Sequence, residues 1–312
     1  MARIKANGID IEYKEYGSPD DPMFLLVSGF SGQMITWPES YLEGLAAAGR
    51  RVVIFDNRDI GLSTEFTNEI PPAPGDIMKG IAAGEDMSAK VPYVLDDMAA
   101  DAAALISALG AEKADVMGYS MGGMIVQLIA LNHPEKVRSL IPVMTTSGDP
   151  SLPRSTEEAQ KALTAQPVTR TANEVADIAA ASRRVIGSAD GVRNSDEAVR
   201  AMATRCFNRS DRPMGVARQY AAILAQPRWH ERLSSLDVPT LVLHGAIDPL
   251  IRPAAGEDIA RRIPGAEIEI IDKWGHDMPE KMVPVLLERI LPFLEKHAPE
   301  DARGDLGGRH GA

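Results

Sequence analysis

Cysteine is nearly absent from this chain of 312 residues, in which Cys206 stands alone. A single cysteine excludes an intrachain disulfide and suits a reducing compartment, so we expect a cytoplasmic protein. Long apolar runs are also missing, because no stretch reaches the ~20 consecutive apolar residues of a membrane-spanning helix. The opening residues MARIKANG lack the apolar core of a signal peptide. We therefore expect neither a membrane anchor nor a secretion signal.

Positive charge is in deficit. The 33 Lys and Arg residues are outnumbered by 44 Asp and Glu residues, which gives a net charge of −11. Nucleic acids are bound mainly through cationic surfaces, and anionic membrane surfaces attract basic segments. We therefore expect neither of these partners, whereas a small-molecule substrate is compatible with this charge.

Short apolar stretches alternate with helical patterns in the first half of the chain. Strands are predicted at residues 10–16, 24–27, 51–55, 115–117 and 137–144. Helices are predicted near residues 38–48, 95–109 and 121–131, with an irregular excursion at 67–92. This alternation predicts an α/β fold, in which helices cover both faces of a mostly parallel sheet.

The pattern changes between residues 147 and 236, where helical patterns occur without a convincing strand. Strand patterns return at 240–244 and 266–271, and a helix follows from about residue 280 to 296, with Pro292 expected to kink or end it. We interpret 1–146 and 237–298 as one core domain and 147–236 as an inserted helical cap. The glycine-rich residues 299–312 are expected to form a flexible tail.

One serine stands at a junction that suits a nucleophile. Ser120 lies in the segment GYSMGG, between a short strand pattern and an apolar helix pattern. A Gly-x-Ser-x-Gly turn at such a junction projects the serine hydroxyl above the carboxyl ends of the strands. A tight turn that merely contains a serine is the alternative, and the flanking patterns favour the nucleophile.

A serine hydroxyl needs a base, and the base needs an orienting acid. In folds with this turn, the three residues follow in the order serine, acid, histidine. Asp248 follows the strand pattern LVLHG, and His276 lies in the loop after the last strand pattern. Asp149 is the alternative acid. Only His276 combines the right loop with the right order, which sets aside the other five histidines: His133, His230, His244, His297 and His310.

Acyl transfer places negative charge on a carbonyl oxygen, which preorganised main-chain amides stabilise. One donor is expected at Met121, directly after the nucleophile, and the other at Phe30 in the upstream loop SGFSG. We expect Gly29, Trp37 and Tyr119 beside the substrate.

Larger side chains elsewhere are further candidates for an apolar pocket, although ordinary packing is the simpler interpretation of each: Met78, Met87, Met214, Tyr220 and Trp229. Three arginines are candidates to meet a substrate carboxylate, although charge on a helix surface is the simpler interpretation: Arg183, Arg184 and Arg218.

These motifs resemble those of the α/β-hydrolase superfamily. The matching segments are FDNRDIGLST at 55–64, GYSMGGM at 118–124, VSGF at 27–30 with Trp37, and the residues Asp248 and His276. They are similar to the branch that contains aclacinomycin methylesterase and related bacterial esterases, including macrolide-ester hydrolases. The similarity spans about residues 8 to 296 and is strong in the core and weak in the cap.

The resemblance implies hydrolysis of a small-molecule or polyketide- or macrolide-type carboxylic ester through an acyl-enzyme on Ser120, with no cofactor or metal. It also implies that the turn at residues 56–61 is structural and braces the loop near the site. Many relatives have His-Gly where this chain has Ser28-Gly29. Because the donor in this loop is a main-chain amide, the difference leaves the expected chemistry intact.

Other functions stay open. Enol-lactone hydrolases share the run Ser-Met-Gly-Gly and are the runner-up, together with the C–C bond hydrolases of aromatic catabolism. Serine at position 120 disfavours relatives with an aspartate nucleophile, such as haloalkane dehalogenases and epoxide hydrolases. A ligand receptor on the same fold is the alternative from a different class. A monomer or a homodimer is expected.

Overall fold

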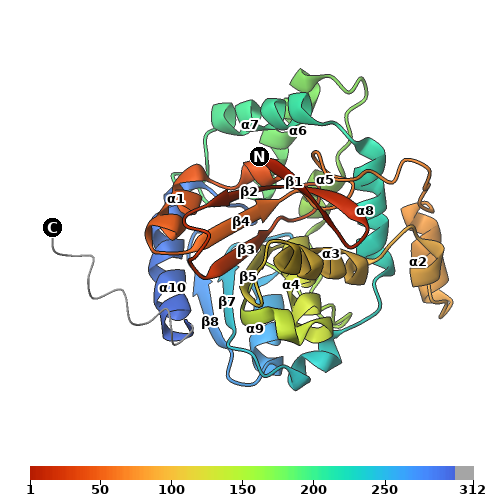
Figure 1. Cartoon of the computed structure of the whole chain (residues 1–312). Helices are drawn as coiled ribbons and strands as arrows, with labels where there is room; N and C mark the ends of the chain where they lie inside the picture. The colour runs from red at the N-terminus through yellow and green to blue at the C-terminus, as the bar shows by residue number, and fades with distance from the viewer. Residues whose placement is uncertain (299–312) are drawn as a thin grey trace.

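An eight-stranded sheet lies at the centre of the computed structural model, which describes residues 1–298 (Figure 1). The strand order is β1-β2-β4-β3-β5-β6-β7-β8. The β1–β2 and β2–β4 pairs are antiparallel, and all pairs from β4 to β8 are parallel. The strands are β1 (Ala2–Ala6), β2 (Ile9–Tyr16), β3 (Met23–Val27), β4 (Arg51–Phe55), β5 (Ala114–Tyr119), β6 (Val137–Val143), β7 (Leu241–Gly245) and β8 (Glu267–Ile271).

Helices cover both faces of this sheet. They are α1 (Glu39–Ala47) and α10 (Val283–Lys296) on one face, and α3 (Leu95–Ala108), α4 (Met121–Asn132) and α9 (Pro253–Arg262) on the other. All residues of β3 are buried. Phe24 and Leu26 pack with α1 and α10, whereas Leu25 and Val27 pack with α3 and α4, because successive side chains of a strand point to opposite faces. The predicted α/β class with a mostly parallel sheet is confirmed.

Residues 147–236 contain four α-helices and no strand. The helices are α5 (Glu157–Thr164), α6 (Ala172–Ile186), α7 (Asp196–Arg209) and α8 (Pro213–Ala225), followed by a 3-10 turn at His230–Ser235. In Figure 1, α6 and α7 lie side by side above the sheet. The last part of the segment packs differently, because Ala222 and Trp229 join the core cluster that contains α3 and α4.

Three elements were not predicted from the sequence. The predicted irregular excursion contains α2 (Pro74–Ala82), which begins with a proline, the residue that suits the first turn of a helix. Its buried residue Ile77 packs against α8. The helix α9 and the edge strand β1 are also additions, and both are short. Short elements carry few periodic positions, so the sequence pattern alone indicates them weakly.

Of the two effects expected of Pro292, a kink or an end of the last helix, the end is wrong. The proline lies inside α10, which continues to Lys296. The next two residues, Phe293 and Leu294, are buried against the sheet, and this packing holds the final turn in place. A 3-10 turn at Glu280–Met282 precedes α10 and accounts for the predicted start of the helix near residue 280.

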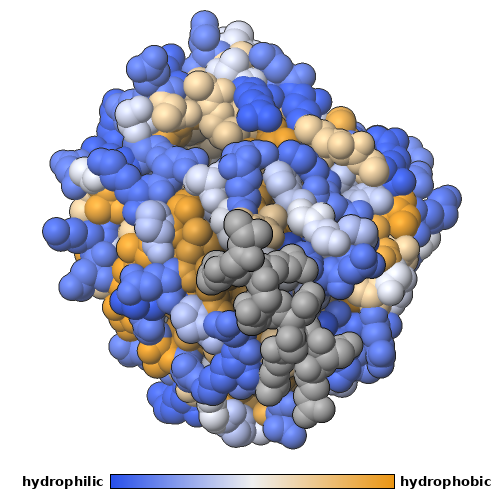
Figure 2. Space-filling view, turned by 60° about the vertical axis from the view of Figure 1, so that its left-hand side comes forward, coloured by the Kyte–Doolittle hydropathy of each residue, from blue (hydrophilic) through white to orange (hydrophobic). Residues whose placement is uncertain are grey.

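On the face shown in Figure 2, hydrophobic residues form patches that are separated by hydrophilic ones. Within residues 1–298, no helix combines the length and the apolar character needed to cross a membrane. The predicted flexible tail, 299–312, lies outside the described residues.

Candidate active site

Ser120 occupies a strained turn between β5 and α4. Its backbone has φ 57° and ψ −124°, a region that residues with a side chain adopt only when the surrounding structure enforces it. Ser120 N donates to Val143 O at 3.0 Å, and Ser120 O accepts from Thr145 Oγ1 at 2.7 Å. These bonds hold the main chain, and the half-buried side chain is presented at the carboxyl end of β5.

Two glycines let the chain make this turn. A Cβ atom on Gly118 would overlap the carbonyl oxygen of Gly122, and a Cβ atom on Gly122 would overlap the carbonyl oxygen of Val27. Only glycine fits such close backbone approaches. The spacing of the motif is therefore set by contacts within the turn and with the neighbouring strand β3.

The structure brings Ser120, His276 and Asp248 into one chain of hydrogen bonds. His276 Nε2 lies 2.9 Å from Ser120 Oγ, and His276 Nδ1 lies 2.7 Å from Asp248 Oδ2. Both His276 and Asp248 are buried. A proton on Nδ1 that is donated to Asp248 leaves the Nε2 lone pair free to accept the serine proton. This is the arrangement that a general base requires.

The other carboxylate oxygen of Asp248 is satisfied by its own loop. Asp248 Oδ1 accepts from Leu250 N at 2.8 Å and from Ile251 N at 3.0 Å. Hydrogen bonds of this kind, between backbone amides and a charged carboxylate, fix the side chain in one orientation. Asp248 therefore presents its second oxygen to the imidazole from a rigid turn.

The alternative acid lies elsewhere. Asp149 Oδ2 is 2.5 Å from Arg262 Nη2, and Asp149 Oδ1 accepts from the amide and hydroxyl of Ser151. Hydrogen bonding to Ser151 lowers the pKa of Asp149. Its contacts belong to a turn and an ion pair, and it makes no contact with the imidazole of His276 among the residues described.

A second histidine lies close behind the acid. His244, on β7, is fully buried, and its Nε2 is 2.8 Å from Ile251 O and 3.7 Å from Asp248 Oδ2. Burial lowers the pKa of His244, which favours its neutral form. The ring therefore donates to a carbonyl beside the acid and has no contact with Ser120.

The two predicted oxyanion donors lie beside the nucleophile. A Cβ atom on Gly29 would lie 3.1 Å from the Ser120 Cβ, so the loop that continues to Phe30 passes directly along the serine. Met121 N is the first amide of α4, where no helical carbonyl is available to it. Within residues 1–298, neither the Phe30 nor the Met121 amide has a hydrogen-bond partner. The assignment of both amides as oxyanion donors stays a prediction.

The turn after β4 braces this loop at its two ends. Asp56 Oδ1 accepts from Met34 N at 2.8 Å, and Asn57 Nδ2 donates to Ser28 O at 3.1 Å. These side chains are buried. The expected bracing role of residues 56–61 is therefore visible as hydrogen bonds to residues 28–34, which we call the donor loop.

A third brace, from α8, was not predicted from the sequence. Gln219 Oε1 accepts from Ser31 N at 3.1 Å, and Gln219 Nε2 donates to Arg58 O at 3.1 Å. Ser31 has φ 59°, a left-handed conformation next to the predicted donor Phe30. No local motif marks Gln219, because its role depends on a partner 188 residues away in the sequence.

The predicted substrate neighbours divide into two groups. Gly29 and the half-buried Tyr119 lie at the nucleophile turn. Trp37 is buried, donates its Nε1 to Ser28 Oγ at 3.0 Å, and packs edge-on against Tyr119. Trp37 therefore supports Ser28 and Tyr119 from the buried side of the site.

Most of the other pocket candidates serve in packing or lie on the surface. Met78 and Met214 are exposed, and Met87 and Trp229 are buried in the core clusters. Tyr220 is different, because its ring centroid lies 5.7 Å from that of Phe30. It is the one candidate in this group that contacts a residue of the donor loop in the described part of the chain.

The chain matches a family model described as alpha/beta hydrolase fold over residues 22–281. It is 26% identical to the rhodomycin D methylesterase DauP of Streptomyces sp. (strain C5) in an alignment 289 residues long that covers 84% of this chain and 87% of the relative. The rhodomycin D methylesterase DnrP of Streptomyces peucetius is also 26% identical, over 292 residues and the same shares of the two chains.

Solved structures show the same architecture. A thermophilic esterase from Thermogutta terrifontis has a TM-score of 0.70 at 25% identity, covering 95% of this chain and 100% of the other. An enol-lactonase from Burkholderia xenovorans LB400 also has a TM-score of 0.70, at 20% identity and with 94% and 99% covered. At that identity the second likeness concerns the fold alone.

Proposed function

The chain belongs to the alpha/beta hydrolase fold family, and we propose that it is a carboxylic ester hydrolase that acts through an acyl-enzyme on Ser120. The observation that carries the proposal is the chain of hydrogen bonds from Ser120 Oγ through the His276 imidazole to Asp248. The names of the two Streptomyces methylesterases support the same reaction class.

In the proposed first half-reaction, Ser120 Oγ attacks the ester carbonyl carbon while His276 Nε2 takes the hydroxyl proton. Asp248 stabilises the imidazolium and keeps its own charge. The amides of Phe30 and Met121 donate to the carbonyl oxygen as it becomes negative. Collapse of this intermediate breaks the ester C–O bond, and His276 gives its proton to the departing alkoxide, which leaves as the alcohol.

Water completes the cycle in the second half-reaction. His276 takes a proton from the water, which attacks the acyl carbon of the Ser120 ester. Collapse of the second intermediate releases the carboxylic acid and returns the proton to Ser120 Oγ. The same residues thus serve both halves of the proposed reaction.

We further propose that the substrate is a small-molecule ester of the polyketide or macrolide type, with a methyl ester as the first candidate. The support is the name of the methylesterase relatives, which cover most of the chain. Our expectation of a cytoplasmic protein rests on the single cysteine, and a monomer or a homodimer stays an expectation.

A substrate panel tests this proposal. It contains aryl esters of graded acyl length, methyl esters of bulky ring acids, and lactones. We expect the wild type to turn over esters and Ser120→Ala to be inactive. The control is Ser234→Ala, which should keep full activity because Ser234 is exposed on the 3-10 turn at His230–Ser235. Equal activity of Ser120→Ala and wild type would overturn the proposal. Turnover of lactones alone would replace it with the enol-lactone alternative.

A further inference from the structure

The loop that carries His276 is bound on one side by the end of α6. His276 N donates to Ile186 O at 2.6 Å, and Ala189 N donates to Lys273 O at 2.9 Å. We call residues 186–189 the α6 linker. These two main-chain bonds run the linker alongside the histidine loop, although the segments are far apart in the sequence.

An arginine from the last turn of α6 binds the opposite side of the same residue. Arg183 Nη1 donates to His276 O at 2.9 Å. Together with the bond to Ile186 O, this means that the N–H and the C=O of His276 both pair with α6. A guanidinium on a carbonyl oxygen is a charge-assisted bond, stronger than a bond between two neutral groups.

The fit between linker and loop is tight. A Cβ atom on Gly275 would overlap the carbonyl oxygen of Gly187, and one on Gly187 would lie 2.8 Å from Asp277 Oδ2. Neither position has room for a side chain. The linker therefore contacts the residues on both sides of the histidine, the backbone at Gly275 and the side chain of Asp277.

A buried pair of side chains adds to the contact between the α6 linker and the histidine loop. Ser188 Oγ lies 2.5 Å from Asp277 Oδ1, and Ser188 N donates to the same oxygen at 3.0 Å. Ser188 Oγ also accepts from Gly275 N at 3.2 Å. Ser188 and Asp277 are buried, so these bonds are shielded from water.

Bonds that do not involve α6 hold the residues near His276 in the same loop. Ile247 N donates to Trp274 O at 3.2 Å, and Trp274 Nε1 donates to Asp277 O at 2.7 Å. These bonds fix the tryptophan and the acid turn. The main-chain N–H and C=O of His276 itself pair with α6 instead.

We propose that Arg183 and the α6 linker are positioning elements for His276, so that seating of α6 sets the geometry of the general base. This inference rests on the proposed function, in which His276 is the base. A helix at the edge of the site then does more than cover the substrate. Its displacement withdraws the main-chain support of the imidazole and stops the chemical step.

The test compares Arg183→Met with its neighbour Arg184→Met. Arg184 is exposed and pairs with Asp196 on α7, so its variant controls for loss of an arginine from α6. With a minimal aryl acetate we expect kcat of Arg183→Met to fall roughly 10- to 100-fold, the size of loss caused by a misplaced catalytic group. KM should stay within twofold, and Arg184→Met should match the wild type. Arg183→Lys, which retains a cationic donor, should recover part of the loss.

Labelling of Ser120 by a small phosphonate provides a second readout, because it needs the base but no bulky substrate. Its rate should fall with kcat in Arg183→Met and in Ser188→Ala, the second variant if Arg183→Met does not fold. Unchanged kcat and labelling in both would overturn the inference. A rise in KM alone would also overturn it and assign Arg183 to substrate binding. Loss of activity in Ser120→Ala beside full activity in Arg183→Met would reject this inference and retain the proposed function.

Discussion

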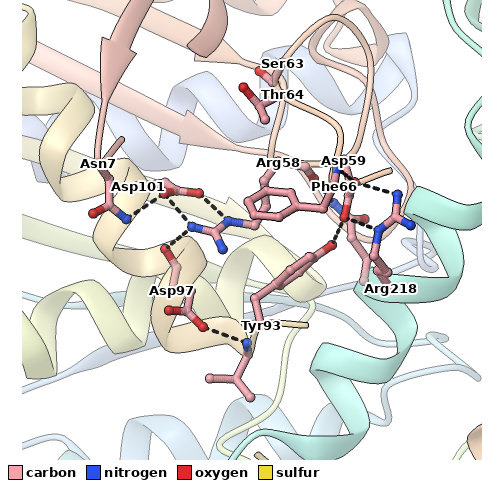
Figure 3. Close-up of polar contacts among 12 residues, drawn as sticks. Asn7, Arg58, Asp59, Ser63, Thr64, Phe66, Tyr93, Asp97, Asp101 and Arg218 are labelled. Atoms are coloured by element: carbon pink, nitrogen blue, oxygen red, sulfur yellow. Dashed lines mark hydrogen bonds and ion pairs between the residues drawn. The ribbon is translucent and has the colours of Figure 1, made fainter. Parts of the chain in front are cut away.

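Asp59 receives two hydrogen bonds from the guanidinium of Arg218, although 159 residues separate them. Arg218 Nε and Nη2 each lie 2.8 Å from a different oxygen of the carboxylate, and both side chains are buried (Figure 3). Tyr93 Oη donates to the same carboxylate at 2.6 Å. Burial, with the nearby charge of Asp59, raises the pKa of Tyr93, so the hydroxyl stays protonated and remains a donor.

This pair joins α8 to the turn after β4. The adjacent Arg58 binds Asp101 of α3 through Nε at 2.6 Å and Nη2 at 2.7 Å, and Asn7 donates to the same carboxylate (Figure 3). The surface-charge interpretation of Arg218 is therefore wrong, and its guanidinium is unavailable to a substrate. The pair holds α8, and α8 carries the Gln219 brace of the donor loop.

Breaking the buried pair should destabilise the fold. Arg218→Met and Asp59→Asn should each lower the free energy of unfolding by about 3–5 kcal/mol, because each leaves a buried partner unpaired. The double variant should lose less than the sum of the two single losses. Urea denaturation of all four proteins measures this coupling. Additive losses would show that the two side chains act independently.

The Gln219 brace should affect the rate more than the stability. Gln219→Met removes the acceptor of Ser31 N, so we expect kcat for an aryl ester to fall roughly tenfold, less than the 10²- to 10³-fold loss of an oxyanion donor itself. Gln226→Met is the matched control, since Gln226 is also buried at α8 but binds Asp96. If kcat fell equally in both variants, the loss would come from general disruption of α8 and not from the Gln219 brace.

The two candidate acids can be separated by substitution. Asp248→Asn should lower kcat on the order of 10³- to 10⁴-fold, because the amide cannot hold the required tautomer or stabilise the imidazolium. Asp149→Asn should leave kcat within a few-fold of wild type, since Asp149 pairs with Arg262. Steady-state kinetics on one aryl ester decide between them, and the reverse ranking would move the orienting role to Asp149.

Activity should rise with pH from the acidic side. A general base accepts the Ser120 proton only in its unprotonated form, so kcat/KM should be low at acidic pH and level off at higher pH. A stopped assay across buffers of equal ionic strength gives the profile. A flat profile from about pH 5 to 9 would exclude a histidine base.

His244 should make the fold less stable in acid. Burial lowers its pKa in the folded protein, whereas the unfolded chain takes up a proton near the ordinary value of ~6.5. The unfolded state then binds more protons, so the free energy of unfolding falls as the pH decreases through that value toward the lowered pKa. His244→Gln should flatten this decline in urea titrations between pH 7 and 5. His133→Gln, at the half-exposed end of α4, is the control. An unchanged slope in His244→Gln would contradict the assignment.

The elements that the sequence predicted well share a local cause. Buried strands such as β3 and β4 are short apolar runs, and α3 and α4 have long helical patterns, so their positions follow from neighbouring residues. The elements it missed are short and are defined by the elements they pair with or pack against. β1 is defined by its pairing with β2, and α2 by its packing on α8.

The sequence alone determined the turn at Ser120, because its strand, its glycine-flanked serine and its helix are contiguous. Asp248 and His276 could also be predicted from the sequence. Each follows a parallel strand, and the carboxyl ends of those strands meet at one edge of the sheet.

Only the tertiary structure decided which side chains hold these residues in place. Arg183 and Arg184 are adjacent arginines, yet one binds the carbonyl of His276 and the other pairs with Asp196 on α7. Successive residues on a helix point in different directions, and what each meets depends on how the helix is docked. Hydrogen bonds between segments 93 or 188 residues apart leave no local pattern, so they could not be predicted from the sequence.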